Sequence, residues 1–409
     1  MARFLAVFAT ISMVVLIGYQ TYDVARADYG MDRAEAAFQL GLLGLAQFIP
    51  LLLLTPVAGI AADRFDRRIV VLIANLVDAG IAAVLAVMTM QDALNLPILF
   101  TLAALHGAAR VFNGPALSAI APNIVPPRLL PRAIALGSIA WQVGSVIGPG
   151  AGGLLFEYSP SFPHFLSAGL LVVSGVLIMT VRPVRARHEG PPVHPVRQIV
   201  LGFQFVTRER FLLGCITLDL FAVLMAGATA LLPVYARDIL GVGPDGLGFM
   251  RGAIAAGAAI VALILSVRPL EKNVGVKMLW SVGVFGAVTI AFALSRDYML
   301  SLALLAMLGA TDMVSVFIRS SLIQLNTPDS MRGRVSSISG LAISASNELG
   351  EMQSGLAALV LGATGAVAFG GAGAIFITLL WAWWFPEIRN AKTFSSKYLD
   401  DDPTREKPV

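Results

Sequence analysis

The sequence has little charge and almost no cysteine, and each shortage excludes a class of protein. Asp, Glu, Lys and Arg make up only 13% of the 409 residues, whereas an average soluble domain carries roughly 25%. A soluble enzyme or a disordered chain therefore does not fit this composition. The single cysteine, Cys215, cannot form an internal bridge, so a disulfide scaffold is excluded as well.

Motifs for metal binding, ATP hydrolysis and nucleophilic catalysis are also missing. The four histidines have no metal-ligand spacing: His106, His164, His188 and His194. No G-x-x-x-x-G-K-S/T phosphate loop occurs, and no Ser/His/Asp or Cys/His set is recognisable. We therefore expect no metal, no cofactor and no enzymatic activity, and we expect that the protein does not drive itself by hydrolysing ATP.

Hydrophobic residues make up 57% of the chain and gather in stretches of about 20 residues, the length of a membrane-spanning helix. Reading these stretches against the polar residues between them predicts an all-α integral membrane protein with twelve transmembrane helices. The expected spans are 4–24, 35–62, 69–90, 97–118, 133–156, 164–181, 211–234, 245–269, 276–295, 299–320, 335–361 and 365–386.

The distribution of Lys and Arg predicts the orientation in the membrane. With the N-terminus inside, most of the 29 basic residues fall on cytoplasmic segments, and the outer loops hold only Arg26, Arg33, Arg237 and Arg296. We therefore expect both termini in the cytoplasm and no nucleic-acid partner, because the basic charge follows the topology. The N-terminal run imitates a secretory signal, but it is longer than a typical signal core and its removal would leave an odd number of helices.

A long polar stretch divides the spans six and six. It predicts four regions: an N-terminal six-helix bundle (1–181), a cytoplasmic linker (182–210), a C-terminal six-helix bundle (211–386) and a cytoplasmic tail (387–409). The two bundles resemble repeats. The shift that lays Gly148 on Gly350 also lays Gly153 on Gly355 and Arg132 on Arg334. Two parallel six-helix repeats are a transporter architecture.

The loop after the second span reads Gly59-Ile-Ala-Ala-Asp63-Arg64-Phe65-Asp66-Arg67-Arg68. An Asp flanked by Arg side chains can form charge-assisted hydrogen bonds at the membrane rim, and such a cluster can hold one conformation closed. The loop resembles the G-x-x-x-D-R-x-G-R-R/K signature of the major facilitator superfamily, with Asp66 where the family usually has Gly. The resemblance implies a cytoplasmic gate made by Gly59, Asp63, Arg64, Arg67 and Arg68. A basic loop that serves topology alone is the alternative.

The fifth span contains Gly144-Ser-Val-Ile-Gly148-Pro149-Gly150-Ala151-Gly152-Gly153. Glycines at helical spacing allow backbones to pack closely, and a proline removes one helix hydrogen bond. The segment resembles the family's G-x-x-x-G-P-x-x-G-G motif, which is associated with exporters that exchange substrate for protons. The resemblance implies an antiporter motif of Gly144, Gly148, Pro149, Gly152 and Gly153, and a generic packing face is the alternative.

A few charges lie inside the predicted spans, where they are costly and therefore candidates for function. Arg110 and Asn113 resemble the family's R-x-x-Q-G motif, and Arg110 lies about 20 Å along its helix. The repeat shift lays Arg110 on Asp312, so these two residues either bind substrate charge or pair with each other. Asp219 is a third cavity candidate, since the seventh span lines the cavity in the family. A buried structural ion pair is the alternative for each.

Glu348 and Glu351 lie three residues apart in the eleventh span and therefore share a helix face. Two ionised carboxylates in a low dielectric repel each other, so we expect at least one of them to hold a proton near neutral pH. Together with Asp312, they are the residues predicted to couple transport to protons. Contact with the outer interface, or a purely structural role, is the alternative. For Asp78 in the third span we expect a tethering role.

The sequence as a whole resembles bacterial exporters of the enterobactin and drug:proton antiporter type in this superfamily. The resemblance implies a secondary antiporter of the bacterial inner membrane that exports a small organic molecule by alternating access. Its partners would be that substrate, protons and membrane lipids, and we expect a monomer. Uptake or lipid flipping is the alternative within the family, and a membrane-embedded enzyme or a channel fits less well.

Overall fold

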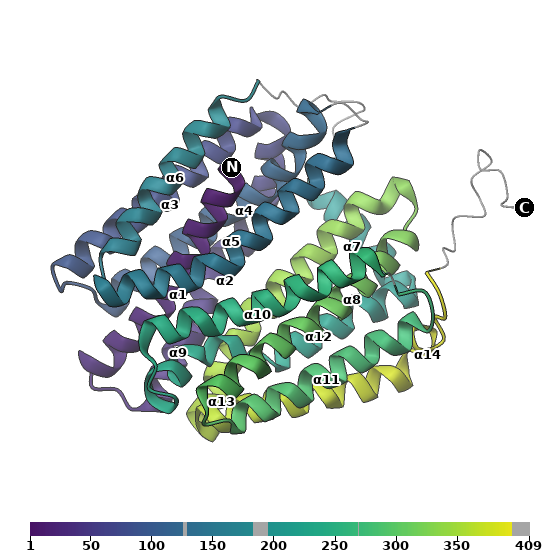
Figure 1. The fold of residues 1–409 in the computed structure, drawn as a ribbon. Helices are drawn as coiled ribbons and strands as arrows, with labels where there is room; N and C mark the ends of the chain where they lie inside the picture. Colours follow the sequence, from purple (N-terminus) through teal and green to yellow (C-terminus); the bar gives the residue numbers. More distant parts are fainter. Residues whose placement is uncertain (126–128, 183–194, 269, 395–409) are drawn as a thin grey trace, which may run out of the picture.

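The computed structural model describes residues 1–125, 129–182, 195–268 and 270–394, and these residues contain helices and no strand. Six long helices form the N-terminal half: α1 (Ala2–Ala27), α2 (Arg33–Arg64), α3 (Arg67–Met90), α4 (Leu96–Ile124), α5 (Leu130–Tyr158) and α6 (Phe162–Met179). The C-terminal half contains α8 (Arg210–Met225), α10 (Gly243–Val267), α11 (Val274–Leu294), α12 (Tyr298–Leu325), α13 (Asp329–Trp384) and α14 (Pro386–Arg389). The two halves lie side by side (Figure 1).

Eleven helices in the described residues are long and apolar enough to cross a membrane. One of them, Met331–Trp384, has 54 residues, which at 1.5 Å per residue is more than twice the thickness of a bilayer core of about 30 Å. Its backbone leaves helical geometry at Gly362, with φ 68° and ψ 168°, a conformation that glycine tolerates. The predicted number of twelve is reached only when α13 is divided at this residue.

The region around the seventh span differs from the expectation of a single helix. After α8, the chain continues as the short turns η2 (Ala228–Leu231), α9 (Leu232–Val234) and η3 (Tyr235–Ile239). Part of the predicted linker is also helical, as α7 (Pro195–Arg208), and it packs against α13. Both are short or amphipathic elements that a search for long apolar runs does not detect.

The two ends of the bundle are named here by residues that mark them. The Arg64 end carries the α2–α3 loop, the start of α13 at Asp329 and helix α14. The Asp238 end carries η3 and the bend of α13 at Gly362, which line one surface hollow together with Arg33 at the start of α2.

Among the described residues, hydrophobic packing is continuous between the halves only at the Asp238 end. One buried cluster there combines Tyr22 and Ala36 of the N-terminal half with Tyr235, Phe292 and Val367 of the C-terminal half. Toward the Arg64 end, the described residues form separate buried clusters in the C-terminal half and in the N-terminal half. The halves are therefore held together at one end, and this places the cavity described next.

Candidate functional site

A cavity of about 750 Å³ lies between the two halves. Its walls come from α1, α2 and α4 on one side and from α8, η2, α10, α11, α12 and α13 on the other. Five ionisable side chains line it: Arg110, Arg251, Asp312, Glu348 and Glu351. A smaller cavity of about 70 Å³ continues it among Leu40, Pro233 and Leu247, nearer the Asp238 end. Four of the same charged side chains line both spaces, so they mark the floor of the large cavity.

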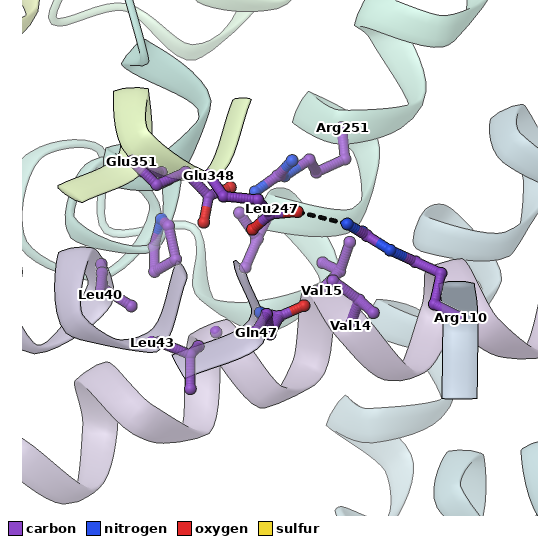
Figure 2. A pocket seen from close by; sticks show the side chains of 13 residues that line it. Val14, Val15, Leu40, Leu43, Gln47, Arg110, Leu247, Arg251, Glu348 and Glu351 are labelled. Atoms are coloured by element: carbon purple, nitrogen blue, oxygen red, sulfur yellow. Dashed lines mark hydrogen bonds and ion pairs between the residues drawn. The ribbon is translucent and has the colours of Figure 1, made fainter. Parts of the chain in front are cut away.

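Arg110 of α4 pairs with Glu348 of α13 across this floor. The distance between Arg110 Nη2 and Glu348 Oε1 is 2.5 Å, and the side chains are 38% and 7% exposed (Figure 2). The two residues belong to different halves, so the pair is a direct electrostatic link between the halves. Sequence reasoning selected both residues but offered Asp312 as the partner of Arg110, and the structure gives Arg110 a different acid.

Glu351 and Arg251 face the same space, and neither forms an ion pair within 4 Å among the described residues. Arg251 Nη2 donates to the carbonyl oxygen of Thr229 at 2.9 Å, and its Nε is buried without a hydrogen-bond partner in the described structure. A Cβ atom on Gly44 would lie 2.7 Å from Glu351 Oε2, so the glycine of α2 makes room for this carboxyl group. The expected shared face of Glu348 and Glu351 is present, and Asp312 lines the same cavity.

Asp219 lies elsewhere than predicted. It is buried and pairs with Arg319 of α12 inside the C-terminal half, and it does not line the cavity. A buried ion pair within one half is a structural tether, since each charge compensates the other. Arg319 lies near the end of the predicted span 299–320, and an opposite charge inside another span was a usable signal for its pairing with Asp219.

Two other intramembrane polar groups are enclosed in the N-terminal half. Asp78 Oδ1 lies 2.9 Å from His106 Nδ1, and both side chains are 1% exposed. This contact joins α3 to α4 and agrees with the tethering role expected for Asp78. Asn113 lies on α4, but it does not line the cavity, and its Oδ1 is buried without a hydrogen-bond partner in the described structure.

The predicted gate loop makes contacts within the N-terminal half. Arg68 pairs with Asp66 at 2.7 Å, and Arg68 Nη1 also donates to the carbonyl oxygen of Val181 at 2.6 Å. Asp66, the departure from the family signature, also caps α3 by accepting from the backbone N–H of Arg68 at 3.0 Å. Arg67 begins α3, and Arg64 is exposed. The side chain of Asp63 lies outside the described part of the structure.

Glycines of the predicted antiporter motif hold α5 against two helices. Cβ atoms on Gly144 and Gly148 would lie 2.9 Å from Val7 Cγ1 and 2.8 Å from the carbonyl oxygen of Phe8. A Cβ on Gly152 would meet Ser12, also on α1. The motif therefore allows the backbones of α5 and α1 to pack in close contact inside the N-terminal half.

The same motif also joins the halves at the seam between α5 and α10. A Cβ on Gly153 would meet the carbonyl oxygen of Pro244, and a Cβ on Gly248 would meet that of Pro149. The repeat has a second copy of this seam between α2 and α13. There, a Cβ on Gly41 would lie 3.1 Å from the carbonyl oxygen of Glu351, and a Cβ on Gly355 would lie 3.4 Å from that of Ala37.

The two seams correspond residue by residue. The shift that lays Pro149 on Glu351 lays Gly153 on Gly355, and the shift that lays Gly41 on Gly248 lays Ala37 on Pro244. Each half thus contributes one helix to each seam, and the glycines and carbonyl oxygens of one seam are equivalent by the repeat to those of the other. Both seams lie toward the Asp238 end of the molecule.

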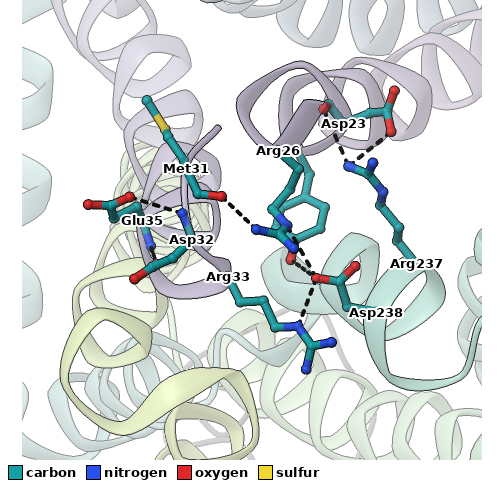
Figure 3. A network of polar contacts seen from close by, with 9 residues as sticks. Asp23, Arg26, Met31, Asp32, Arg33, Glu35, Arg237 and Asp238 are labelled. Carbon is teal, nitrogen blue, oxygen red and sulfur yellow. Dashed lines mark hydrogen bonds and ion pairs between the residues drawn. The ribbon is translucent and has the colours of Figure 1, made fainter. Parts of the chain in front are cut away.

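A polar network covers the Asp238 end. Asp238 Oδ2 accepts from Tyr22 Oη at 2.7 Å and lies 3.2 Å from Arg33 Nε and 3.5 Å from Arg26 Nε (Figure 3). Next to it, Arg237 Nη1 lies 3.0 Å from Asp23 Oδ1. Every one of these contacts joins the N-terminal to the C-terminal half. Sequence reasoning placed the basic residues on outer loops without pairing them to acids on the opposite half.

The Arg64 end has the opposite character. Cβ atoms on Gly59, Gly114, Gly333 and Gly340 would meet nothing within 4 Å, and Ser337 and Gly340 of α13 line the large cavity. The cavity thus extends toward the Arg64 end, while the glycine seams and the polar network close the Asp238 end. The structure is one state of a molecule with a central chamber, charged at its floor.

Comparisons with known proteins agree with this architecture. The family model described as "Major Facilitator Superfamily" matches residues 3–351. The chain is 27% identical over 340 residues to "Enterobactin exporter EntS" of Escherichia coli O1:K1 / APEC, covering 83% of this chain and 79% of the relative. The same protein of Shigella boydii matches with the same identity and coverage.

Solved structures share the fold at low sequence identity. A POT family transporter in complex with 5-aminolevulinic acid has a TM-score of 0.73 at 14% identity, covering 95% of this chain and 96% of that one. A D-xylose-proton symporter has a TM-score of 0.69 at 14% identity, covering 96% and 98%. A bacterial homolog of human Spinster, in an inward-facing and occupied conformation, has a TM-score of 0.69 at 14% identity, covering 100% and 98%. At these identities the likeness concerns the fold alone.

Proposed function

The chain belongs to the major facilitator superfamily, and from this premise we propose that it is a proton-coupled antiporter that exports a small organic molecule by alternating access. That it is a multi-pass membrane transporter rather than an enzyme follows from the family itself. The coupling ion, the direction and the class of substrate are the proposal.

The observation that carries the proposal is the set of charges on the cavity floor. Glu348 and Glu351 share one face of α13, and only Glu348 has a cationic partner within ion-pair distance in the described structure. Two adjacent carboxylates away from bulk water are costly to ionise together, which favours a proton on one of them. We assign that proton to Glu351, because Arg110 compensates the charge of Glu348.

Exchange of substrate for protons follows because both compete for the same carboxyl groups in one cavity. A substrate that enters from the Arg64 end reaches the floor, where its donor or cationic groups compete with the proton for Glu351 and Asp312. A loss of the proton leaves an ionised carboxylate against the α2 backbone at Gly44, and hydration of that charge favours opening of the seam between α2 and α13. Substrate and proton would then occupy the site in turn, which is antiport.

The orientation in the membrane, the type of membrane and the class of substrate are also part of the proposal. The charge distribution of the sequence supports a cytoplasmic location for the Arg64 end and both termini, and the structure would then be inward-facing. The similarity to an enterobactin exporter supports export across a bacterial inner membrane, with a siderophore or a drug-like compound as substrate. The proton gradient would be the only energy source, with no cofactor and no nucleic acid, and the unit would be a monomer.

The test is proton movement in proteoliposomes that contain the purified protein and a pH-sensitive dye. A library of siderophores and drug-like compounds is added to one side, and proton flux opposite to substrate flux is the expected result. We expect Glu351→Gln and Glu348→Gln to reduce exchange at least about tenfold, because each removes a protonatable group from the floor.

Glu271→Gln is the matched control, since Glu271 is exposed in the connection between α10 and α11. It should exchange like the wild type. Movement of substrate and protons in the same direction would contradict antiport and indicate proton-coupled uptake instead. Normal exchange by both floor variants would contradict the assignment of the proton to these carboxylates.

A further inference from the structure

A second hollow lies on the outside of the C-terminal half, away from the chamber. It has a volume of about 430 Å³ and is formed by α11 and the second part of α13, with α14 at one end. Figure 1 shows α11 beside the yellow part of α13. Its lining residues are Val276, Leu279, Trp280, Gly283, Ile375, Thr378, Leu379, Ala382 and Arg389. We call this hollow the α11–α13 groove.

The wall of the groove suits a hydrocarbon chain. Thr378 and Arg389 are the only lining residues with polar side chains apart from the Trp280 indole, and the Thr378 hydroxyl donates to the carbonyl oxygen of Ala374 at 2.8 Å. Trp280 and Leu379 are 70% and 67% exposed, and they face the region occupied by lipid. A polar ligand would find almost no partner along this wall.

Close contacts at two glycines of α11 mark the ends of the groove. At Gly286 the helices are in close contact, because a Cβ there would lie 2.6 Å from the carbonyl oxygen of Gly371. One turn earlier, a Cβ on Gly283 would lie 3.9 Å from Thr378 Cγ2, an ordinary contact distance. Nearer the Arg64 end, the backbone N–H of Gly275 donates to the carbonyl oxygen of Ala391 at 3.0 Å. The groove therefore lies between two backbone contacts, at Gly275 and Gly286, which are about 16 Å apart along α11 at 1.5 Å per residue.

The contact of Gly275 with the segment after α13 also gathers positive charge at the membrane surface. Arg389 lines the groove at this end, Lys392 follows Ala391 in the chain, and Lys277 lies two residues along α11 from Gly275. All three side chains are exposed, and none forms an ion pair within 4 Å in the described part of the chain. The nearby acid, Glu387, pairs with Arg210 at 3.4 Å.

We propose that the α11–α13 groove binds an anionic phospholipid, with one acyl chain in the groove and the phosphate against Arg389 and Lys277. The apolar wall and the unpaired cations at its surface end match the two parts of such a lipid. A basic residue near a membrane surface favours anionic lipid, and the effect falls off within a Debye length. The site is separate from the chamber and does not depend on the transport proposal.

The test is native mass spectrometry of the full-length protein with phosphatidylglycerol and phosphatidylcholine that have the same acyl chains. We expect stronger retention of phosphatidylglycerol. Arg389→Gln and Lys277→Gln should each lower its affinity about fivefold, with little effect on phosphatidylcholine. Arg182→Gln, which removes an exposed cation at the end of α6 in the other half, is the matched control and should have no effect.

Gly283→Leu tests the chain-binding part separately. Its side chain would occupy the groove, so both lipids should be lost together while their ratio is unchanged. Equal retention of the two lipids by the wild type, or unchanged retention in Arg389→Gln, would overturn the proposal. A dimer in the wild-type spectrum that becomes a monomer in Gly283→Leu would also overturn it, because a second copy would then be the occupant.

Discussion

At the scale of single residues, the sequence identifies the charges of the site but not their partners. Arg110, Asp312, Glu348 and Glu351 were selected because charge inside a span is costly, and all four line one cavity. Position along a helix gives depth in the membrane, whereas rotation about the axis and the packing of the halves decide which side chains meet. Arg110 therefore pairs with Glu348 rather than with Asp312, and Asp219 pairs with Arg319.

The Arg110–Glu348 pair gives a prediction at this scale. Charge reversal of either residue places like charges on the cavity floor, so Arg110→Glu and Glu348→Arg should each lower the melting temperature in detergent. The double reversal should recover part of the loss, with a coupling of roughly 0.5–3 kcal/mol. Thermal unfolding followed by intrinsic fluorescence measures all four proteins. Losses that simply add in the double variant would show that the two side chains do not interact.

At the scale of helices, apolar runs and the polar residues between them were enough to predict most spans. The bend of α13 at Gly362 falls in the break expected between the last two spans, at 362–364. The broken segment from Ala228 to Ile239 was not predictable, because it depends on packing at the Asp238 end rather than on local composition. The glycines of α5 were recognised as a packing motif. That Gly153 faces Pro244 and Gly248 faces Pro149 required the arrangement of the two halves.

The α5–α10 seam gives a prediction for Gly248→Ala. The new Cβ would collide with Pro149, and overpacking costs about 1–3 kcal/mol, so the state closed at the Asp238 end should lose population. Spin labels at Tyr29 and Met299, which are exposed on opposite halves, should move apart in a Cys215→Ser background. Gly80→Ala in α3 is the matched control, since its Cβ meets open space. An unchanged distance in Gly248→Ala would contradict the role of this seam.

At the scale of the whole molecule, two halves enclose a chamber that is closed at the Asp238 end. The closed end combines a continuous hydrophobic cluster, two equivalent glycine seams and the contacts of Asp238 with Tyr22, Arg26 and Arg33. The open end has none of these among the described residues. The family resemblance predicted such a fold from the sequence, but the state that the molecule adopts follows only from contacts between the halves.

The central claim is that protonation of Glu351 is linked to the exchange of states. The Glu351 carboxyl lies against α2 at Gly44 when the Asp238 end is closed. This half-buried position beside Glu348 favours the protonated form, so the closed state should gain population as pH falls. Loss of the proton as pH rises should favour opening of the Asp238 end, where water can reach the carboxylate.

The most direct measurement is the Tyr29–Met299 spin-label distance between pH 5 and pH 9, which needs no substrate. The account predicts that the wild type and the control Glu271→Gln shift from the short to the longer distance as pH rises. Glu351→Gln should keep one distribution at every pH. An equal pH response in Glu351→Gln, or none in the wild type, would contradict the account.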